Sequence, residues 1–146
     1  MPKQEQITQH YCIQGWSAVG KWGGVRMRDI VSLVRPLPQA HWVVFYSFGS
    51  GPGGYDPQVD EGGRYYDAHK IEHMKHDLTI LAYEMNDAPV NELHGAPLRL
   101  RNELELGFKQ VKWIEAIEFV ETFAHLGRGQ GGFNEDHEFY GYRMPI

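Results

Sequence analysis

The chain has 146 residues, of which 42% are hydrophobic, 13% aromatic and 23% charged. This size and balance are typical of one globular domain and exclude a disordered or low-complexity chain. The net charge of −5 argues against a nucleic-acid partner, because a surface that binds nucleic acid is usually basic.

The first half of the sequence predicts two strands and a helix. Residues 7–13 mix apolar, aromatic and β-branched side chains and predict a strand that leads into the single cysteine, Cys12. Residues 15–24, rich in glycine and tryptophan, predict a loop. Residues 28–34 carry four apolar side chains over two turns and predict a short helix that ends before Pro36. The continuous run of β-formers at residues 42–48 predicts a buried strand.

The second half adds further strands. Residues 49–63 hold six glycines and two prolines and predict a long irregular loop. A short helix is expected at residues 69–76, a strand at 79–85, a turn at 86–89, a half-exposed strand at 98–106 and another strand at 111–120. Residues 127–146 are expected to wrap the surface. The sequence therefore predicts an α+β, mostly β fold, with one domain over residues 1–146.

The N-terminus and the apolar runs of the sequence bear on the cellular location of the protein. The longest apolar runs, at residues 42–48 and 79–83, are too short to span a bilayer. The first six residues lack the apolar core of a secretion signal. The expected location stays open: cytoplasmic as the chain stands, or periplasmic if an upstream signal was lost.

The single cysteine and one basic strip carry the chemical information. A cysteine thiolate is a soft ligand for metals, although a lone cysteine is more often a small buried hydrophobe. The strip at residues 94–113 has four Lys or Arg side chains against two carboxylates, so it carries +2 while the rest of the chain carries −7. Such a distribution favours a small anionic ligand, because Arg and Lys are the usual phosphate partners.

Four blocks, in the same order, resemble a known family. They are Trp-Gly-Gly-Val at residues 22–25, Ile-Leu-Ala-Tyr-Glu-Met-Asn at 80–86, His-Gly-Ala-Pro-Leu-Arg-Leu at 94–100 and Gly-Phe-Lys-Gln-Val-Lys-Trp at 107–113. Together they resemble the molybdopterin-binding domain shared by sulfite oxidases, assimilatory nitrate reductases and the bacterial protein-methionine-sulfoxide reductase. The resemblance runs from about residue 6 to the C-terminus. It implies a sulfite-oxidase-type fold and a molybdenum–molybdopterin cofactor.

The resemblance assigns roles to single residues. It implies that Cys12 ligates the molybdenum, and that His94, Arg99 and Lys112 contact the pterin or its phosphate. Lys109 stands where sulfite oxidases have an arginine, so it is expected to anchor the cofactor as well. Gly107 would let the backbone approach the ligand closely, and Trp22 would pack either against the pterin edge or in the core. Arg101 is expected to be an ordinary exposed charge.

The residues after Cys12 point to one branch of the family. Sulfite oxidases have arginines soon after the cysteine, whereas here Ile-Gln-Gly-Trp-Ser follows, which looks more like the Cys-x-Glu-x-Trp-Ser of the methionine-sulfoxide-reductase branch. Gln14 replaces the acidic residue of that pattern. The resemblance therefore implies two-electron oxygen-atom transfer on a small-molecule substrate such as a sulfoxide. A separate haem or quinone-linked partner would supply electrons, since the sequence contains no haem or flavin motif.

The start of the chain departs from the family. Relatives begin well upstream of the cysteine, whereas this chain begins eleven residues before Cys12. An N-terminally truncated domain would expose a sheet edge and an apolar face, which predicts self-association or weak cofactor binding. The alternative function is a non-catalytic remnant of the same fold that binds no metal and acts as an interaction module.

Three histidines offer a second metal hypothesis. His69, His73 and His76 have the spacing of one helix face, which could present three imidazoles to zinc. The segment lacks an obvious fourth ligand, and solvated histidines on a polar helix are the favoured interpretation.

Overall fold

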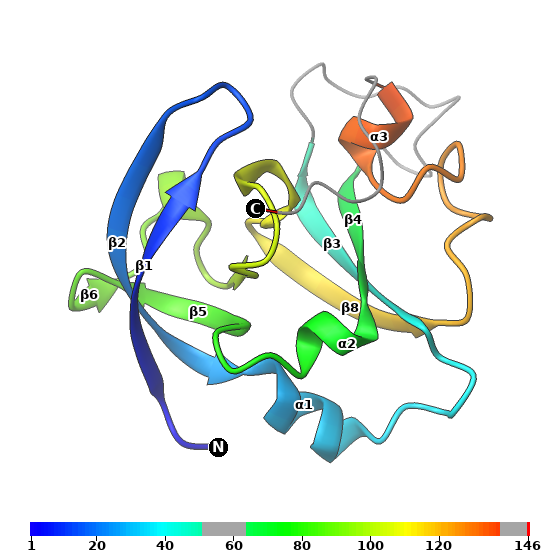
Figure 1. Cartoon of the computed structure of the whole chain (residues 1–146), viewed down its shortest axis with the longest axis horizontal. Coiled ribbons are helices and arrows are strands. Elements are labelled where there is room, and N and C mark those ends of the chain that lie inside the picture. The colour runs from blue at the N-terminus through cyan, green and yellow to red at the C-terminus, as the bar shows by residue number, and fades with distance from the viewer. Residues whose placement is uncertain (51–63, 138–145) are drawn as a thin grey trace.

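The computed structural model describes residues 1–50, 64–137 and 146. Two antiparallel sheets face one another across a core, with helices α1 (Met27–Val34) and α2 (Ile71–Met74) at one end of the molecule and α3 (Phe133–His137) at the other (Figure 1). None of the described helices is long and apolar enough to cross a membrane. The predicted α+β, mostly β fold is therefore confirmed.

The larger sheet carries the N-terminal hairpin. Its strand order is β1-β2-β5-β6, with β7 on the same edge of β5 as β6. Every described pairing in it is antiparallel, and β1 pairs with β2 along its whole length. The strands are β1 (Gln4–Tyr11), β2 (Ser17–Arg26), β5 (Ile80–Met85), β6 (Ala88–Pro89) and β7 (Arg99–Arg101).

The smaller sheet is antiparallel with the order β4-β3-β8. Its strands are β3 (Trp42–Ser50), β4 (Arg64–Lys70) and β8 (Ile114–Val120). The α-helices are α1 (Met27–Val34), α2 (Ile71–Met74) and α3 (Phe133–His137), and the 3-10 helices are η1 (Glu92–His94) and η2 (Gly107–Lys109).

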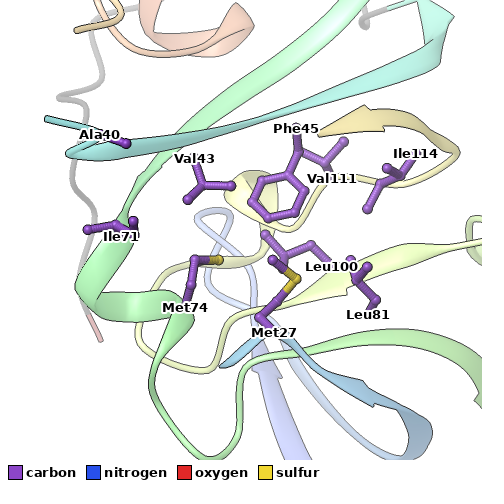
Figure 2. Close-up of a cluster of buried hydrophobic side chains, with 10 residues drawn as sticks. All are labelled: Met27, Ala40, Val43, Phe45, Ile71, Met74, Leu81, Leu100, Val111 and Ile114. Carbon is purple, nitrogen blue, oxygen red and sulfur yellow. The ribbon is translucent and has the colours of Figure 1, made fainter. Parts of the chain in front are cut away.

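The main core lies between the two sheets. The larger sheet contributes Leu81 and Leu100, and Phe45 projects toward them from the smaller sheet (Figure 2). Helix α1 begins with Met27, which is fully buried in the same cluster. Burying large apolar side chains from both sheets is the main force that holds them face to face. The ten members are Met27, Ala40, Val43, Phe45, Ile71, Met74, Leu81, Leu100, Val111 and Ile114.

Several predicted elements are confirmed, namely those at residues 7–13, 28–34, 42–48, 79–85 and 111–120. The loop expected at residues 15–24 is wrong, because residues 17–26 form β2. Its glycines serve close strand approach: a Cβ on Gly24 would overlap the backbone of Leu81, and the register with β5 shifts between Gly23 and Gly24. Most of the loop expected at residues 49–63 lies outside the described residues.

Four other expectations need correction. The strand expected at residues 98–106 is only β7, and its three residues are buried instead of half exposed. Arg101 is accordingly fully buried and is no ordinary surface charge. The helix expected at residues 69–76 shortens to α2, because His69 belongs to β4. The tail does not simply wrap the surface, since the first four residues of α3 are buried.

Candidate functional site

A cavity of about 730 Å³ opens between the hairpin of β1 and β2 and the segments that follow β5. Its volume is in the range of small-molecule and cofactor sites. Residues that are 80 or more positions apart in the sequence line it together. The lining includes six of the seven residues that the sequence assigned to a site, namely Cys12, Trp22, His94, Arg99, Gly107 and Lys112.

Cys12 lies in the turn that joins β1 to β2. Its backbone N–H donates to the carbonyl of Trp16 at 2.9 Å, and its own carbonyl accepts from the N–H of Gly15 at 3.0 Å. Gly15 has φ +91°, which a residue with a side chain would adopt only at a cost. The thiol is free and partly exposed, and its Sγ lies 3.5 Å from the N–H of Gln14. The turn therefore presents one sulfur atom to the cavity.

Arg99 and Lys112 supply positive charge to the cavity. The guanidinium of Arg99 is 6% exposed and donates through Nη1 to the carbonyl of His94 at 2.8 Å. The ammonium of Lys112 donates to the carbonyl of Leu93 at 2.9 Å. Within the described ranges neither side chain forms an ion pair with a carboxylate. The cavity thus holds two cations that are bound by neutral carbonyl groups.

Burial makes these two charges costly. Burial, together with repulsion from the nearby Arg101, lowers the pKa of Arg99 to about 9, although attraction to Glu103 acts to raise it. Burial followed by repulsion from Arg99 also lowers the pKa of Lys112. The Nε atom of Arg99 is buried without a hydrogen-bond partner among the described residues. An anion in the cavity would relieve each of these costs.

His94 also faces the cavity, at the end of η1. Its Nδ1 lies 2.7 Å from Oδ1 of Asn91, which also accepts from the backbone N–H of His94 at 2.9 Å. Because a carboxamide oxygen only accepts, Nδ1 must carry a proton. In the neutral ring Nε2 is then an acceptor, so donation from Nε2 to an anion requires the doubly protonated ring.

Trp22 lies beneath the two arginines of β7. The guanidinium carbons of Arg99 and Arg101 lie 4.7 Å and 4.6 Å from its ring centroid, within the range of cation–π contact. The ring is 4% exposed, and its Nε1 is buried without a partner among the described residues. Trp22 is thus a buried residue that also lines the cavity, and its packing against a pterin stays a prediction.

His10 is a cavity residue that the sequence did not single out. Its Nδ1 accepts from Nη1 of Arg101 at 2.7 Å, and Arg101 is held in turn by two hydrogen bonds to Glu103, of 2.9 Å and 2.8 Å. Burial, together with repulsion from Arg101, lowers the pKa of His10 to about 4, so the ring is neutral with its proton on Nε2. The sequence could have indicated His10 by its position two residues before Cys12, on the same strand face as Thr8.

Gly107 lies against this histidine at the start of η2. A Cβ at position 107 would overlap the imidazole of His10. The backbone at Gly107 therefore approaches a protein side chain on the cavity wall closely, whereas the expectation was a close approach to the ligand.

Lys109 lies outside the cavity lining. Its ammonium is 2.6 Å from Oδ1 of Asp67 and 2.5 Å from Oε1 of Glu135, and all three side chains are buried. Although burial acts to lower it, attraction to both carboxylates raises the pKa of Lys109 above its ordinary value. Burial raises the pKa of Asp67 well above its usual value. The group ties η2 to β4 and α3.

The three histidines of the zinc hypothesis do not meet. His69 is buried on β4, and its ring bonds Asn102 and the carbonyl of Lys109 at 2.9 Å and 2.8 Å. His73 lies in α2 at 3.4 Å from Glu105, whereas His76 follows the end of that helix. No cluster of three or more potential ligands occurs among the described residues.

The C-terminal helix also reaches the cavity. Asn134 of α3 and Tyr65 of β4 both line it, and the side-chain amide of Asn134 donates to the Tyr65 hydroxyl at 3.1 Å. That hydroxyl donates to the carbonyl of Phe108, which is a lining residue too. No sequence pattern placed Asn134 near Cys12, because the tail shows little periodicity.

This fold and this cavity are those of a ligand-binding domain with room for a cofactor-sized molecule. Residues 1–125 match the family model described as the oxidoreductase molybdopterin binding domain, so the chain belongs to that family. The resemblance inferred from the four sequence blocks is confirmed.

Relatives place the chain near one group within the family. It is 34% identical over 125 residues to the protein-methionine-sulfoxide reductase catalytic subunit MsrP of Xanthomonas campestris, covering 81% of this chain and 37% of that protein. It is 28% identical over 139 residues to the putative protein-methionine-sulfoxide reductase subunit YedZ1 of Azospira oryzae, covering 95% and 45%. The chain therefore spans less than half the length of these relatives.

A solved structure shares the fold. The sulfane dehydrogenase SoxCD of Paracoccus pantotrophus superposes with a TM-score of 0.67 at 16% identity, covering 84% of this chain and 33% of that one. The expected sulfite-oxidase-type molybdopterin-binding fold is confirmed.

Proposed function

We propose that the cavity binds a molybdenum–molybdopterin cofactor and that the domain catalyses two-electron oxygen-atom transfer on a sulfoxide. The observation that carries this proposal is the convergence of Cys12, Arg99 and Lys112 on one cavity from three distant parts of the sequence. Cys12 is the metal ligand, while Arg99 and Lys112 bind the phosphate. His94 contacts the same end of the cofactor.

The residues present fit this cofactor. A single thiolate suits a soft metal, and two cations that have no carboxylate partner among the described residues suit a phosphate. The Nε of Arg99, which has no partner in the same part of the chain, provides a further buried donor at this place. The cavity is large enough for a ligand of this size and is lined by the aromatic rings of Trp22, Phe108 and Trp113.

When bound, the cofactor supplies the oxygen-atom transfer chemistry, and the protein supplies binding and orientation. The turn at residues 12–16 presents the thiol, and Trp22 supports the guanidinium of Arg99 from below. His10 presents a neutral ring to the cavity, because its Nδ1 is occupied by Arg101.

The charges and the apolar rim favour an uncharged substrate. Among the described lining residues the permanent cations are Arg99 and Lys112, both assigned to the cofactor phosphate. The rim carries the exposed side chains of Trp16 and Leu93, at 52% and 79% exposure. Sulfite is a dianion that needs its own cations, whereas a methionine-like sulfoxide can use apolar contacts. The names of the relatives agree with a sulfoxide.

A separate haem or quinone-linked protein is proposed as the source of electrons. The relatives that are named catalytic subunits support a partner of this kind. The exposed edge strand β1 is the proposed site of any homo-oligomer.

Metal analysis tests the proposal. The chain is produced in a host that makes molybdopterin, alongside a known molybdoenzyme as a loading control. We expect close to one molybdenum per chain, lost in Cys12→Ser and retained in Ser32→Ala, which changes an exposed hydroxyl on α1. Loaded protein should then reduce a methyl sulfoxide with a dye donor and leave sulfite unoxidised. Absence of molybdenum while the control enzyme is loaded would refute the proposal.

A further inference from the structure

Three consecutive carbonyl groups in η1 are each bound by a side chain from the cavity. The carbonyl of Glu92 accepts from the indole N–H of Trp113 at 2.7 Å. The next, of Leu93, accepts from Lys112 at 2.9 Å, and that of His94 accepts from Arg99 at 2.8 Å. The carbonyls at the end of a 3-10 helix have few partners within the helix, so they are natural acceptors. The result is one row of oxygens that fixes both cations.

Trp113 holds Lys112 in a second way. The Lys112 ammonium lies 4.4 Å from the centroid of the Trp113 ring, so it has a ring on one side and the Leu93 carbonyl as an acceptor. A cation–π contact that is partly shielded from water contributes more than an exposed one. Two neighbouring residues thus cooperate, because the tryptophan limits the positions open to the lysine amine.

The backbone at Trp113 is strained. Its φ is +54°, a left-handed conformation that bulky side chains rarely adopt. Strain of this kind persists where the surroundings impose it, and it is concentrated at functional sites. Here the N–H of Trp113 donates to the carbonyl of Gly95 at 3.2 Å, and its carbonyl accepts from the N–H of Phe48 at 3.0 Å. Both backbone groups of Trp113 are therefore fixed.

Gly95 makes this arrangement possible. It follows η1 with φ +109°, and a Cβ there would lie 2.8 Å from Cβ of Lys112 and 3.2 Å from Cβ of Arg99. The backbone after η1 therefore packs directly against the stems of the two cations. Any side chain at position 95 would push the cations away from the row of carbonyls.

From these contacts we infer that Trp113 is a positioning residue, which fixes η1 and Lys112 so that the Lys112–Arg99 pair is set for the cofactor phosphate before it arrives. The inference rests on the proposed function and deepens it. Arg and Lys have several N–H donors, so each cation can keep its carbonyl and still donate to phosphate oxygens. Preset donors bind more tightly because less side-chain entropy is lost on binding.

Inorganic phosphate is the probe, measured by calorimetry on the cofactor-free protein at low ionic strength. Trp113→Phe keeps a ring beneath the lysine and removes the N–H, so we expect about five- to tenfold weaker phosphate binding. Trp42→Phe is the matched control, since Trp42 packs against Phe123 in another cluster and should leave the affinity unchanged. Arg99→Gln reports on the site itself and should abolish binding.

A double-variant cycle separates positioning from a general structural role. In a Lys112→Met background, Trp113→Phe should weaken phosphate binding less than it does in the unaltered chain, because the lysine, one of the two groups that the tryptophan fixes, is gone. An equal loss in both backgrounds would overturn the inference. If Trp113→Phe binds phosphate normally while Arg99→Gln does not, the inference is wrong and the proposed cofactor site stands. If Arg99→Gln and Lys112→Met both bind normally, the proposed site itself is wrong.

Amide exchange of the unaltered protein keeps the inference testable if Trp113→Phe does not fold. With the carbonyl row kept intact, phosphate should slow hydrogen exchange at residues 93–95. Faster exchange on phosphate binding would mean that the cations leave their carbonyls, which contradicts presetting.

Discussion

Nδ1 of His10 accepts a hydrogen bond from Nη1 of Arg101 at 2.7 Å, across 91 positions of sequence. The contact joins the strand before Cys12 to the strand that carries Arg99. It also settles the chemical state of the imidazole, because a guanidinium can only donate. The cavity wall beside Cys12 is thus held by a buried polar network that includes Glu103 and Thr8.

Replacing His10 tests this network. We expect His10→Leu to lower the free energy of unfolding by about 1–3 kcal/mol, since it leaves an N–H of the buried Arg101 without an acceptor. Urea denaturation gives the measurement. Gln9→Leu is the control, because Gln9 is the exposed neighbour on the outer face of β1, and it should cost less than about 0.5 kcal/mol. Equal stability of His10→Leu and Gln9→Leu would argue that the network contributes nothing.

Lys109 separates a role in the fold from a role in cofactor binding. Lys109→Met leaves the carboxylates of Asp67 and Glu135 buried without their cation, so we expect a loss of about 3–5 kcal/mol in the free energy of unfolding. Lys75→Met, at an exposed position after α2, should have little effect. Should Lys109→Met lose molybdenum while its unfolding free energy is unchanged, Lys109 would instead be the cofactor anchor that the resemblance implied.

The pKa of Lys112 predicts proton uptake on phosphate binding. Burial and Arg99 lower this pKa in the empty cavity, and an anion should raise it again. Between the two values the free protein holds fewer protons than the complex, so binding takes up protons and weakens as pH rises through the range. Calorimetry just below the ordinary lysine value of 10.5, in two buffers of different ionisation enthalpy, measures the uptake. The Lys112→Met protein should take up no proton at this position. Undiminished proton uptake in that variant would assign the uptake to another group.

The outer face of the hairpin predicts self-association. Ile7 and Val19 are 71% and 68% exposed on neighbouring strands, and β1 has β2 as its only neighbour among the described strands. An unpaired edge beside an apolar face favours pairing with a second chain. We expect light scattering to show a concentration-dependent dimer that Ile7→Lys weakens. Leu33→Lys, an equally exposed position on α1, should leave the dimer intact, and a strictly monomeric protein would contradict the prediction.

Much of the fold followed from local pattern. The continuous β-formers at residues 42–48 and the apolar turns at 28–34 predicted β3 and α1, because burial on one or both faces dictates such patterns. The loop expected around Gly23 and Gly24 was wrong, since glycine that permits close strand approach looks the same in sequence as glycine that permits a turn.

The motifs predicted part of the site, and the residues that they missed are those whose place depends on tertiary contacts. Cys12, Arg99 and Lys112 line one cavity as the four blocks suggested. Lys109 lies at a motif position, yet its ammonium points to Asp67 and Glu135, which no local pattern links to it. His10 and Asn134 were missed because their roles arise from neighbours about 70 to 90 residues away.

Helix α3 lies beyond residue 125, where the family match ends, but it supplies Asn134 to the cavity and Glu135 to Lys109. A boundary drawn from the family model alone would therefore cut through the wall of the cavity. Protein shortened to that boundary would lose Asn134 from the cavity wall and would leave Lys109 with only one of its two carboxylate partners. Any attempt to transplant or shorten this domain has to include helix α3.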